Sequence, residues 1–382
     1  MKIFSHDIIK RHSNTIGERN EVDETLALPI FCQDLLGQNI FDPKWTWKSK
    51  FFRIVLLFIQ SESNLSSTAE AYFFVISLTL FLIKYLFFIN CSKDYQETYL
   101  RAKTSLLKII MASSSVKSKK LLKKFKVMVR ILFFCLFVLI SPLLLIAIWN
   151  YPFGRRETFS KSIDTLMPTT SPFYEIGLIL HTVVCPSAVF LNFVIDLWFA
   201  VLLSFFCTAS DSLETMLKIE HDADETELEY KDRLNNTLKT FYEGHATLMQ
   251  FLSTLCKMFK WLTIIPLVSV LSSFCLTLFS ISEELDWQFL CHAVPCLVQI
   301  LAYNWFGEQM KDKQTKLTMA LLEFDWISMR IEEKKNYLII ISYMNKEYRI
   351  KTALGIDLSF VTLTSVLKAS YQVNTILRTM EI

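Results

Sequence analysis

The sequence predicts an all-α, polytopic membrane protein with seven transmembrane helices, and three observations lead to this fold class. First, 52% of the 382 residues are apolar and the mean hydropathy is +0.34, whereas about 45 to 50% apolar residues is usual for soluble domains. Second, the chain has only 7 glycines and 9 prolines, too few for the many tight turns of an all-β protein. Third, several apolar runs reach the roughly 20 residues that a helix needs to cross a bilayer.

Five runs carry almost no charge over the length of a full span: residues 69–89, 131–149, 173–207, 261–281 and 287–307. A sixth run, residues 45–60, has basic side chains near its start, whose long stems let the charges reach the membrane surface. The seventh, residues 356–377, has polar and apolar sides at helical spacing. We expect this last helix to lie against protein or water, because a polar stripe is costly in lipid.

The distribution of basic residues predicts an inverted orientation, with the N-terminus inside and the C-terminus outside. Residues 91–130 hold eleven Lys and Arg against two acids, whereas the links 61–68 and 282–286 hold no base. Basic loops stay on the cytoplasmic side, so counting spans from residues 91–130 places both ends of the chain. This is the reverse of a G-protein-coupled receptor. The sequon at Asn64 falls in an outside loop and is a candidate glycosylation site.

We expect one membrane domain over the whole chain. Residues 1–44 form a cytoplasmic N-terminal segment without the apolar core of a signal peptide, residues 45–307 hold spans one to six, and residues 356–380 hold span seven. Residues 209–254 and 308–351 are charged, helical in pattern and hardly interrupted by Gly or Pro. We interpret both as cytoplasmic helices that extend the spans.

Motifs for catalysis or cofactor binding are absent from the sequence. There is no Walker A loop, no GxSxG, no HExxH and no intramembrane Asp/His pair at helical spacing, and no nucleic-acid partner is expected. Six of the 9 cysteines lie inside apolar runs without CxxC or Cys/His metal spacing, so buried small side chains explain them better than disulfides. We therefore predict neither an enzyme nor a metal or cofactor site.

The outer halves of the spans gather aromatic and small polar side chains. An apolar pocket with a few polar groups is the usual character of a small-molecule site, although each aromatic taken singly is typical of the membrane interface. The two histidines among them could serve a ligand or a structural hydrogen bond. The candidate ligand-binding residues are Tyr72, Phe73, Ser77, Ser141, Leu145, Trp149, Tyr174, His181, Phe279, Cys291 and His292.

Two further polar features lie within the spans. Asp196, in the fourth span, is a functional candidate because a carboxylate inside a membrane is costly; the commoner alternative is a hydrogen bond to a neighbouring helix. In span seven, Lys368, Gln372 and Thr375 share one side of the helix. If several chains meet around one axis, this stripe would line a watery pore. The alternative is packing within its own bundle.

Four stretches near the C-terminus carry a family resemblance: YNWFG (303–307), ALLEFDW (320–326), KKNYLIII (334–341) and LKASYQVNTILR (367–378). Their order and spacing resemble the C-terminal signature of the insect odorant receptor family. That signature has an aromatic and a Gly ending span six, a downstream Trp, a basic residue before an apolar helix, and a Leu-Lys-x-Ser-Tyr element in span seven. Leu322 departs from it, since relatives often carry a Tyr at that place.

The resemblance implies a ligand-gated, non-selective cation channel in the plasma membrane of an olfactory sensory neuron. Such a chain binds small volatile odorants in an outer-half pocket of spans one to six, and forms a heterotetramer with the odorant receptor co-receptor. Residues 308–351 would hold the cytoplasmic anchor helices between subunits, and residues 356–380 would line the pore. Matching the family element to this chain adds Tyr371, Asn374 and Arg378 to the pore candidates.

A homomeric gustatory-type ligand-gated cation channel is the alternative. That class would favour a more polar pocket and a tail of the Thr-Tyr-x5-Gln-Phe kind, where this chain has Ser370-Tyr371 followed by Leu377-Arg378. A metabotropic receptor or a transporter is disfavoured by the inverted orientation and by the lack of paired spans broken at Gly or Pro.

Overall fold

The computed structural model describes residues 79–112, single positions between 120 and 134, residues 171–283 apart from 172 and 223, residues 287–344 and residues 349–380. This part of the chain is almost wholly helical, and its one β-feature is an isolated antiparallel bridge between Lys351 and Asp357. The prediction of a mainly helical fold is therefore confirmed. The predicted span at residues 45–60 and most of that at 131–149 lie outside the described residues.

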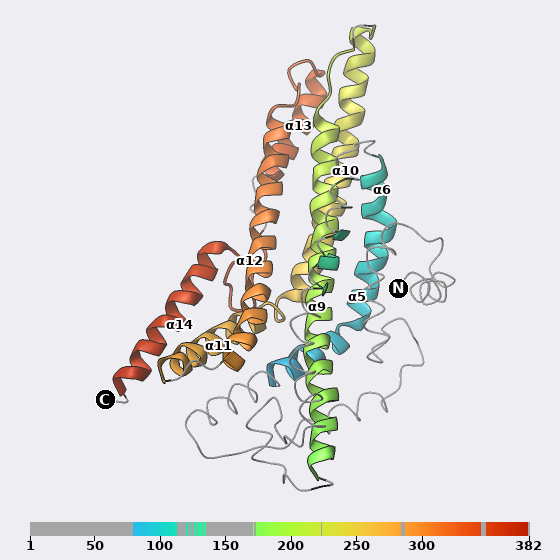
Figure 1. Ribbon diagram of the computed structural model, residues 1–382. Coiled ribbons are helices and arrows are strands. Elements are labelled where there is room, and N and C mark those ends of the chain that lie inside the picture. The colour runs from blue at the N-terminus through green and yellow to red at the C-terminus, as the bar shows by residue number, and fades with distance from the viewer. Residues whose placement is uncertain are drawn as a thin grey trace.

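Three long helices form the body of the molecule (Figure 1). Helix α9 (Phe173–Leu217) has 45 residues, α10 (Glu227–Phe259) has 33 and α12 (Trp287–Leu322) has 36. At about 1.5 Å per residue, α9 is about 68 Å long, more than twice the thickness of a bilayer core. Helix α10 returns antiparallel along α9, and α12 packs on the other side of α9.

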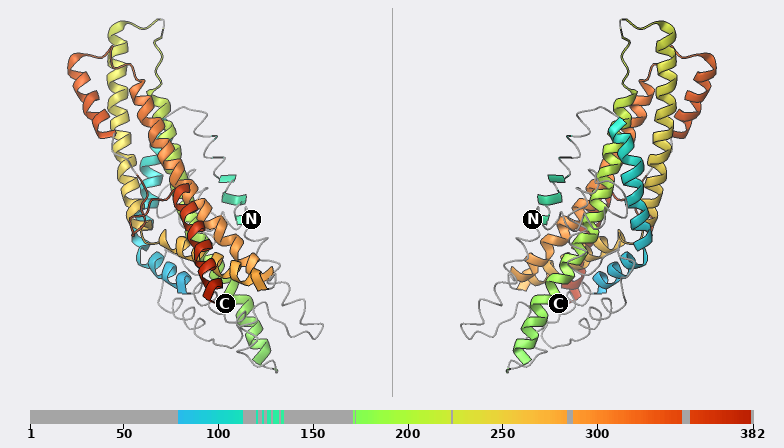
Figure 2. Two further views of the ribbon diagram at one scale, coloured as in Figure 1. Left: turned by 90° about the vertical axis from the view of Figure 1, so that its left-hand side faces the viewer. Right: turned by 90° about the vertical axis from the view of Figure 1, so that its right-hand side faces the viewer.

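Shorter helices pack around this body (Figures 1 and 2). The helix Thr79–Asn90 leads into α5 (Ser92–Arg101), a π-helical turn η2 (Ala102–Leu106) and α6 (Leu107–Ala112), which lie against α9 and α10. Helices α11 (Ile264–Glu283) and α14 (Phe360–Met380) pack together near one end of the molecule. Helix α13 (Ile331–Met344) folds back along the far end of α12.

The sequence of α10 explains its start and its buried side. Thr226 and Glu229 form a capping box, in which each side chain bonds the backbone N–H of the other. Such a cap satisfies two donors that a helix start leaves without intrahelical partners. The buried positions that follow recur every three or four residues, as an amphipathic helix requires: Tyr230, Leu234, Leu238, Phe241, His245, Leu248, Leu252, Leu255 and Phe259.

The chain bends by 45° between α10 and α11. A short turn at residues 260–263 closes with hydrogen bonds from the Thr263 N–H to Phe259 and from the Ile264 N–H to Trp261. Pro266 falls in the first turn of α11, where its missing N–H costs no intrahelical hydrogen bond. The bend carries α11 away from α9 toward α14 (Figure 1).

Aromatic side chains fill the core where α5, α9, α10 and α12 meet. Trp198 is fully buried, and the Tyr95 ring meets it edge-on at 5.7 Å between ring centroids. Phe199 stacks on Tyr303 at 4.3 Å. Offset and edge-on pairs of this kind contribute about 0.5 to 1.5 kcal/mol beyond their burial. They hold α9, the central helix, against α5 and α12, and an edge-on contact of Phe199 with Phe259 adds α10.

Within the described residues, Phe190–Leu217 is the helical stretch that is long and apolar enough to cross a membrane by itself. The bent pair Glu227–Phe259 and Ile264–Cys275 meets the same test when taken together. Seven spans and the inverted orientation therefore stay predictions.

Candidate functional site

Asp196 lies at the centre of a polar cluster that joins three helices. Its Oδ1 accepts hydrogen bonds from the Lys84 ammonium and, at 2.6 Å, from the Tyr303 hydroxyl. Its Oδ2 accepts a hydrogen bond from the Gln299 amide at 2.5 Å. The carboxylate belongs to α9, and its donors come from the helix Thr79–Asn90 and from α12.

Lys84 is fully buried and is held entirely by α9. Besides the ion pair with Asp196, its ammonium donates to the Asn192 side-chain oxygen at 2.6 Å and to the Asn192 carbonyl at 3.3 Å. Its three donors thus have three acceptors. A buried charge is tolerated when it is both paired and hydrogen-bonded. The sequence left two interpretations of Asp196, a functional site or a hydrogen bond to a neighbouring helix. The structure shows the hydrogen bonds.

Sequence reasoning missed the partners of Asp196. Lys84 is the one charged residue in the second half of the apolar run 69–89, and a lone base inside a span calls for a lone acid in another. Gln299 and Tyr303 are spaced four apart on α12, which places them on one side of the helix. A search for opposite charges in different apolar runs would have paired Lys84 with Asp196.

The polar stripe of α14 points away from the rest of the chain. Lys368, Gln372 and Thr375 are exposed, and the neighbouring Tyr371 is 65% exposed. The opposite side packs on α11 and α12 and buries Leu363, Ser370 and Asn374, of which Asn374 is 4% exposed. The pore candidates thus fall on two sides of the helix. The side chain of Arg378, one turn further on, lies outside the described residues.

The candidate ligand residues of the outer half are only partly described. Tyr174 is buried in the first turn of α9. His181, Phe279, Cys291 and His292 lie on α9, α11 and α12, and the structure describes their helical backbone alone. The rest of this set, together with the sequon, lies outside the described residues: Tyr72, Phe73, Ser77, Ser141, Leu145, Trp149 and Asn64. The predicted pocket therefore stays a prediction.

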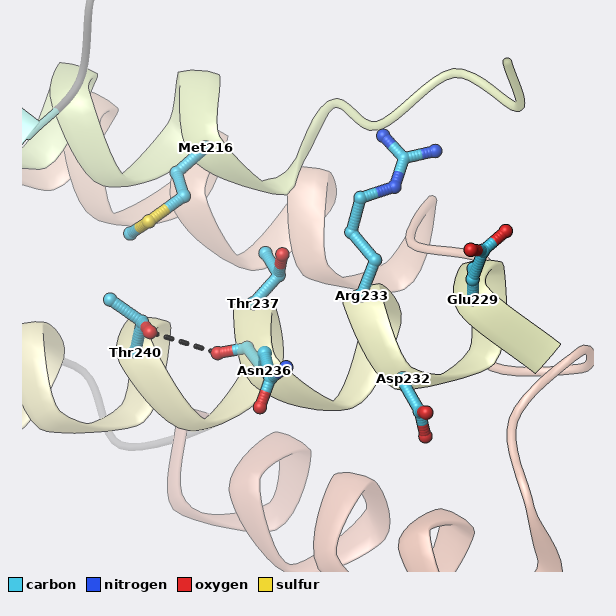
Figure 3. Close-up of a pocket in the computed structure, with 7 residues that line it drawn as sticks. All are labelled: Met216, Glu229, Asp232, Arg233, Asn236, Thr237 and Thr240. Carbon is cyan, nitrogen blue, oxygen red and sulfur yellow. Dashed lines mark hydrogen bonds between the residues drawn. The ribbon is translucent and has the colours of Figure 1, made fainter. Parts of the chain in front are cut away.

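A solvent-open hollow of about 410 Å³ lies between the last turn of α9 and the first turns of α10 (Figure 3). Polar side chains of α10 line it, and Met216 reaches toward them from α9. Its charged groups already have partners: Arg233 Nε donates to Glu225 at 2.9 Å, and Asp232 pairs with Arg330 at 2.7 Å. A hollow with these walls does not suit an apolar ligand, which needs burial in apolar surroundings.

The first half of α10 and the last turns of α12 meet α13 in a packed region, which we predict from the sequence to be cytoplasmic. The Tyr337 hydroxyl of α13 donates to the Leu321 carbonyl at 2.8 Å, and the Tyr337 ring stacks on Trp326 at 5.6 Å. His245 of α10 is 2% exposed between the rings of Phe241 and Tyr343. Burial lowers the pKa of His245 to about 4, because the charged imidazolium loses its hydration there.

Several large apolar side chains are exposed on the outward side of α13 and in the turn before it, beside the exposed Glu332 and Lys335. Exposed fractions reach 79% at Ile331 and 70% at Ile327. Leu338, Ile339 and Tyr343 continue this side along the helix and are also exposed. A single exposed apolar residue is ordinary, whereas several large ones on one short helix are a candidate interaction surface. We call these five residues the α13 patch.

Comparisons with known proteins agree with this architecture. The model of a family described as 7tm odorant receptor matches residues 64–371. No curated protein matches the sequence. The solved structure of the insect olfactory receptor OR5 from Machilis hrabei is similar with a TM-score of 0.72 at 13% identity, covering 93% of this chain and 97% of that one. The same receptor in complex with eugenol is similar with a TM-score of 0.73 at 12% identity, covering 94% and 100%.

The structural likeness concerns the fold, since the identity is low. The family match is broader evidence, because it extends from before the helix Thr79–Asn90 to Tyr371 in α14 and so includes the Asp196 cluster. Proteins of this family are membrane-embedded receptors and not enzymes, in agreement with the missing catalytic motifs. The resemblance read from the C-terminal motifs is thereby confirmed. The chain belongs to the 7tm odorant receptor family.

Proposed function

We propose that this chain is the odorant-binding subunit of a ligand-gated, non-selective cation channel, which works as a heterotetramer with the odorant receptor co-receptor. It would lie in the plasma membrane of an olfactory sensory neuron, with the N-terminus inside and the C-terminus outside. Family membership supports the receptor role. The channel role rests on features of α14 and α13.

The observation that carries the channel proposal is the exposed polar side of α14. Lys368, Gln372 and Thr375 face away from the subunit's own bundle, and a polar side of a membrane helix is stable only against protein or water. If several subunits place this side toward a common axis, it lines a hydrated path for ions. Asn374 is buried against the bundle, so in this arrangement it supports the helix from behind.

The α13 patch supports assembly into an oligomer. A subunit that stayed alone would leave these apolar side chains in water, at about 25 cal/mol for each Å² of apolar surface. Contact with neighbouring subunits would bury them, as expected of anchor helices that project beyond the membrane. The long α9, α10 and α12 place α13 far from the end where α11 and α14 meet (Figure 1).

For the ligand, we propose a small volatile odorant bound in the outer half of spans one to six. Eugenol, bound by OR5 of Machilis hrabei, is a reasonable first compound to test. A mainly apolar pocket would discriminate by shape, at about 0.8 kcal/mol per buried methylene. Binding would favour the open state by its higher affinity for that state, as in any population shift.

The experiment is whole-cell current from cells that express this chain with and without the co-receptor, during exposure to a panel of small aromatic and aliphatic volatiles under G-protein blockade. We expect a rapid cation current only in the co-expressing cells. Current from this chain alone would favour the homomeric gustatory-type alternative. Lack of current in both, with the chain at the cell surface, would contradict the channel proposal.

A further inference from the structure

Residues 350–359 form a tight hairpin that leads directly into α14. The Leu358 N–H donates to the Ile350 carbonyl at 3.0 Å, next to the bridge between Lys351 and Asp357. At the tip Gly355 has φ +78°, a conformation that strains residues with a side chain. The end of the hairpin is Ser359, whose Oγ accepts a hydrogen bond from the Thr362 N–H at 3.2 Å and so caps α14.

Two side chains of α12 hold the start of α14. The Asn304 Oδ1 accepts a hydrogen bond from the Ser359 N–H at 2.9 Å, while the Asn304 Nδ2 donates to the Ile300 carbonyl at 2.8 Å. Asn304 is fully buried. One turn along α12, Glu308 accepts a hydrogen bond from the Phe360 N–H at 3.4 Å. These N–H groups belong to the first positions of a helix, which have no intrahelical acceptor.

The backbones of α12 and the hairpin also touch. A Cβ atom at Gly307 would lie 2.2 Å from the carbonyl oxygen of Leu358, so the contact exists only because Gly307 has no side chain. On its other side the hairpin is tied to the end of α10, where the Ala353 N–H donates to the Lys260 carbonyl at 2.8 Å. The hairpin is thus clamped between α12 and the bend that leads into α11.

We propose that this hairpin is the joint through which α12 sets the position of α14, and that Asn304 is its positioning residue. The inference rests on the proposed function in one respect, namely that α14 lines the pore. Further along α14 the contacts with α11 and α12 are largely apolar, through Leu267, Val270, Ile300 and Leu363. Apolar contacts allow one helix to slide on another, because they have no fixed direction. The hydrogen bonds of the Asn304 amide do have a fixed direction, since both its oxygen and its nitrogen are bonded.

Displacement of α12 on ligand binding would therefore move the start of α14 with it. Asn304→Leu removes the acceptor for the Ser359 N–H and keeps the number and branching of the side-chain heavy atoms. Asn304→Asp keeps an acceptor there, and its negative charge suits a helix N-terminus. Gly307→Ala would force the two backbones apart. Gly244→Ala is the matched control, because its Cβ would meet only the flexible end of Leu213, at 2.7 Å.

The test combines two measurements on the full chain assembled with the co-receptor. The first is the maximal odorant-evoked current at matched surface expression. We expect Asn304→Leu and Gly307→Ala to lower it by roughly fivefold or more, in the usual range of coupling between sites. Asn304→Asp should recover most of it, and Gly244→Ala should match the wild type. Equal currents in all four variants would overturn the proposal.

The second measurement is hydrogen exchange of the peptides that cover residues 350–366 in the purified protein, which needs no current. We expect faster exchange in Asn304→Leu than in the wild type and in Asn304→Asp, because the Ser359 N–H loses its acceptor. If the wild type conducts no odorant-evoked current, the channel proposal fails. Hydrogen exchange still measures whether Asn304 holds the start of α14. Unchanged exchange in Asn304→Leu would show that Asn304 does not hold α14. The proposed coupling of α12 to α14 would then be wrong, whatever the currents are.

Discussion

At the scale of single residues, the Asp196 cluster shows how a charge can be kept inside a helix bundle. The Lys84 ammonium donates to Asn192 and to Asp196. The Asp196 carboxylate also accepts hydrogen bonds from Gln299 and Tyr303. A complete cluster of this kind adds little net stability, because desolvation offsets the attraction between the charges. Removal of one partner is different, since the other charge is then left without compensation.

Lys84→Met should therefore destabilise the protein by about 3 kcal/mol or more, and Lys84→Met combined with Asp196→Leu should recover much of that loss. The measurement is the midpoint of heat denaturation in detergent, together with the amount of chain at the cell surface. Lys316→Met is the matched control, since its ion pair with Asp312 is exposed and such pairs contribute about 0 to 1 kcal/mol. A double variant as unstable as the single one would show that the charge pair is not the cause.

The buried His245 should make the stability of the fold depend on pH. Its pKa is about 4 in the folded protein, against about 6.5 when unfolded, so between these values the unfolded state binds more protons. Stability is then complete above pH 6.5 and is lost as the pH falls toward 4. Between pH 7 and pH 5 the wild type should lose about 2 kcal/mol that His245→Phe does not lose. Denaturation midpoints at both pH values check this, with the exposed His221→Gln as a control that should behave like the wild type.

At the scale of elements, α14 shows that the rotation of a helix decides the role of each side chain. Gln372 and Asn374 are two residues apart, which places them on opposite sides of the helix. The structure exposes the first and buries the second. The motif that identified the family could not supply this rotation, since it fixes register along the chain and not the direction of each side chain.

Gln372→Ala should change the permeability ratio of small cations through the assembled channel, because Gln372 would face the pore. Asn374→Ala should leave that ratio as it is and act on stability, because Asn374 packs against the bundle. Reversal potentials in mixed ionic solutions measure the first effect, and surface expression measures the second. If both variants kept the wild-type ratio, α14 would not line the pore.

Much of the helical layout could be predicted from the sequence, and the reasons are physical. The apolar run of residues 173–207 is too long and too poor in charge for anything but a membrane or core helix, and it became the first part of α9. The amphipathic run of residues 356–377 overlaps α14. The partnership of Lys84 with Asp196 was not predicted, because residues 112 apart meet only through the packing of three helices. The hairpin of residues 350–359 was missed because one β-bridge leaves no periodic pattern.

At the scale of the whole molecule, the proposed channel gives the two ends of the structure different tasks. Helices α11 and α14 meet at one end, and α13 with its exposed apolar patch lies toward the other (Figure 2). Helices α9, α10 and α12 connect the two ends without interruption. A subunit built in this way can assemble at one end while the other end moves.

Replacing Ile331 and Ile339 together by Glu should weaken assembly, because charges would enter the surface that neighbouring subunits bury in the proposed channel. The measurement is the amount of co-receptor that copurifies with this chain, with the native particle size beside it. Leu228→Glu is the control, as Leu228 is an exposed apolar residue at the start of α10, outside the α13 patch. Equal copurification in all three proteins would exclude the α13 patch as a subunit contact.

The buried Lys84 also constrains how the protein is made. The ribosome completes the helix Thr79–Asn90 well before it adds Asp196, which follows Lys84 by 112 residues. During that interval the ammonium lacks its carboxylate, and release of the helix into hydrocarbon would expose the charge to lipid. If these helices are the predicted spans two and four, we expect span two to stay beside the translocon, in contact with water or headgroups, until span four is made. In that case we expect distant spans to enter the bilayer together and not one helix after another.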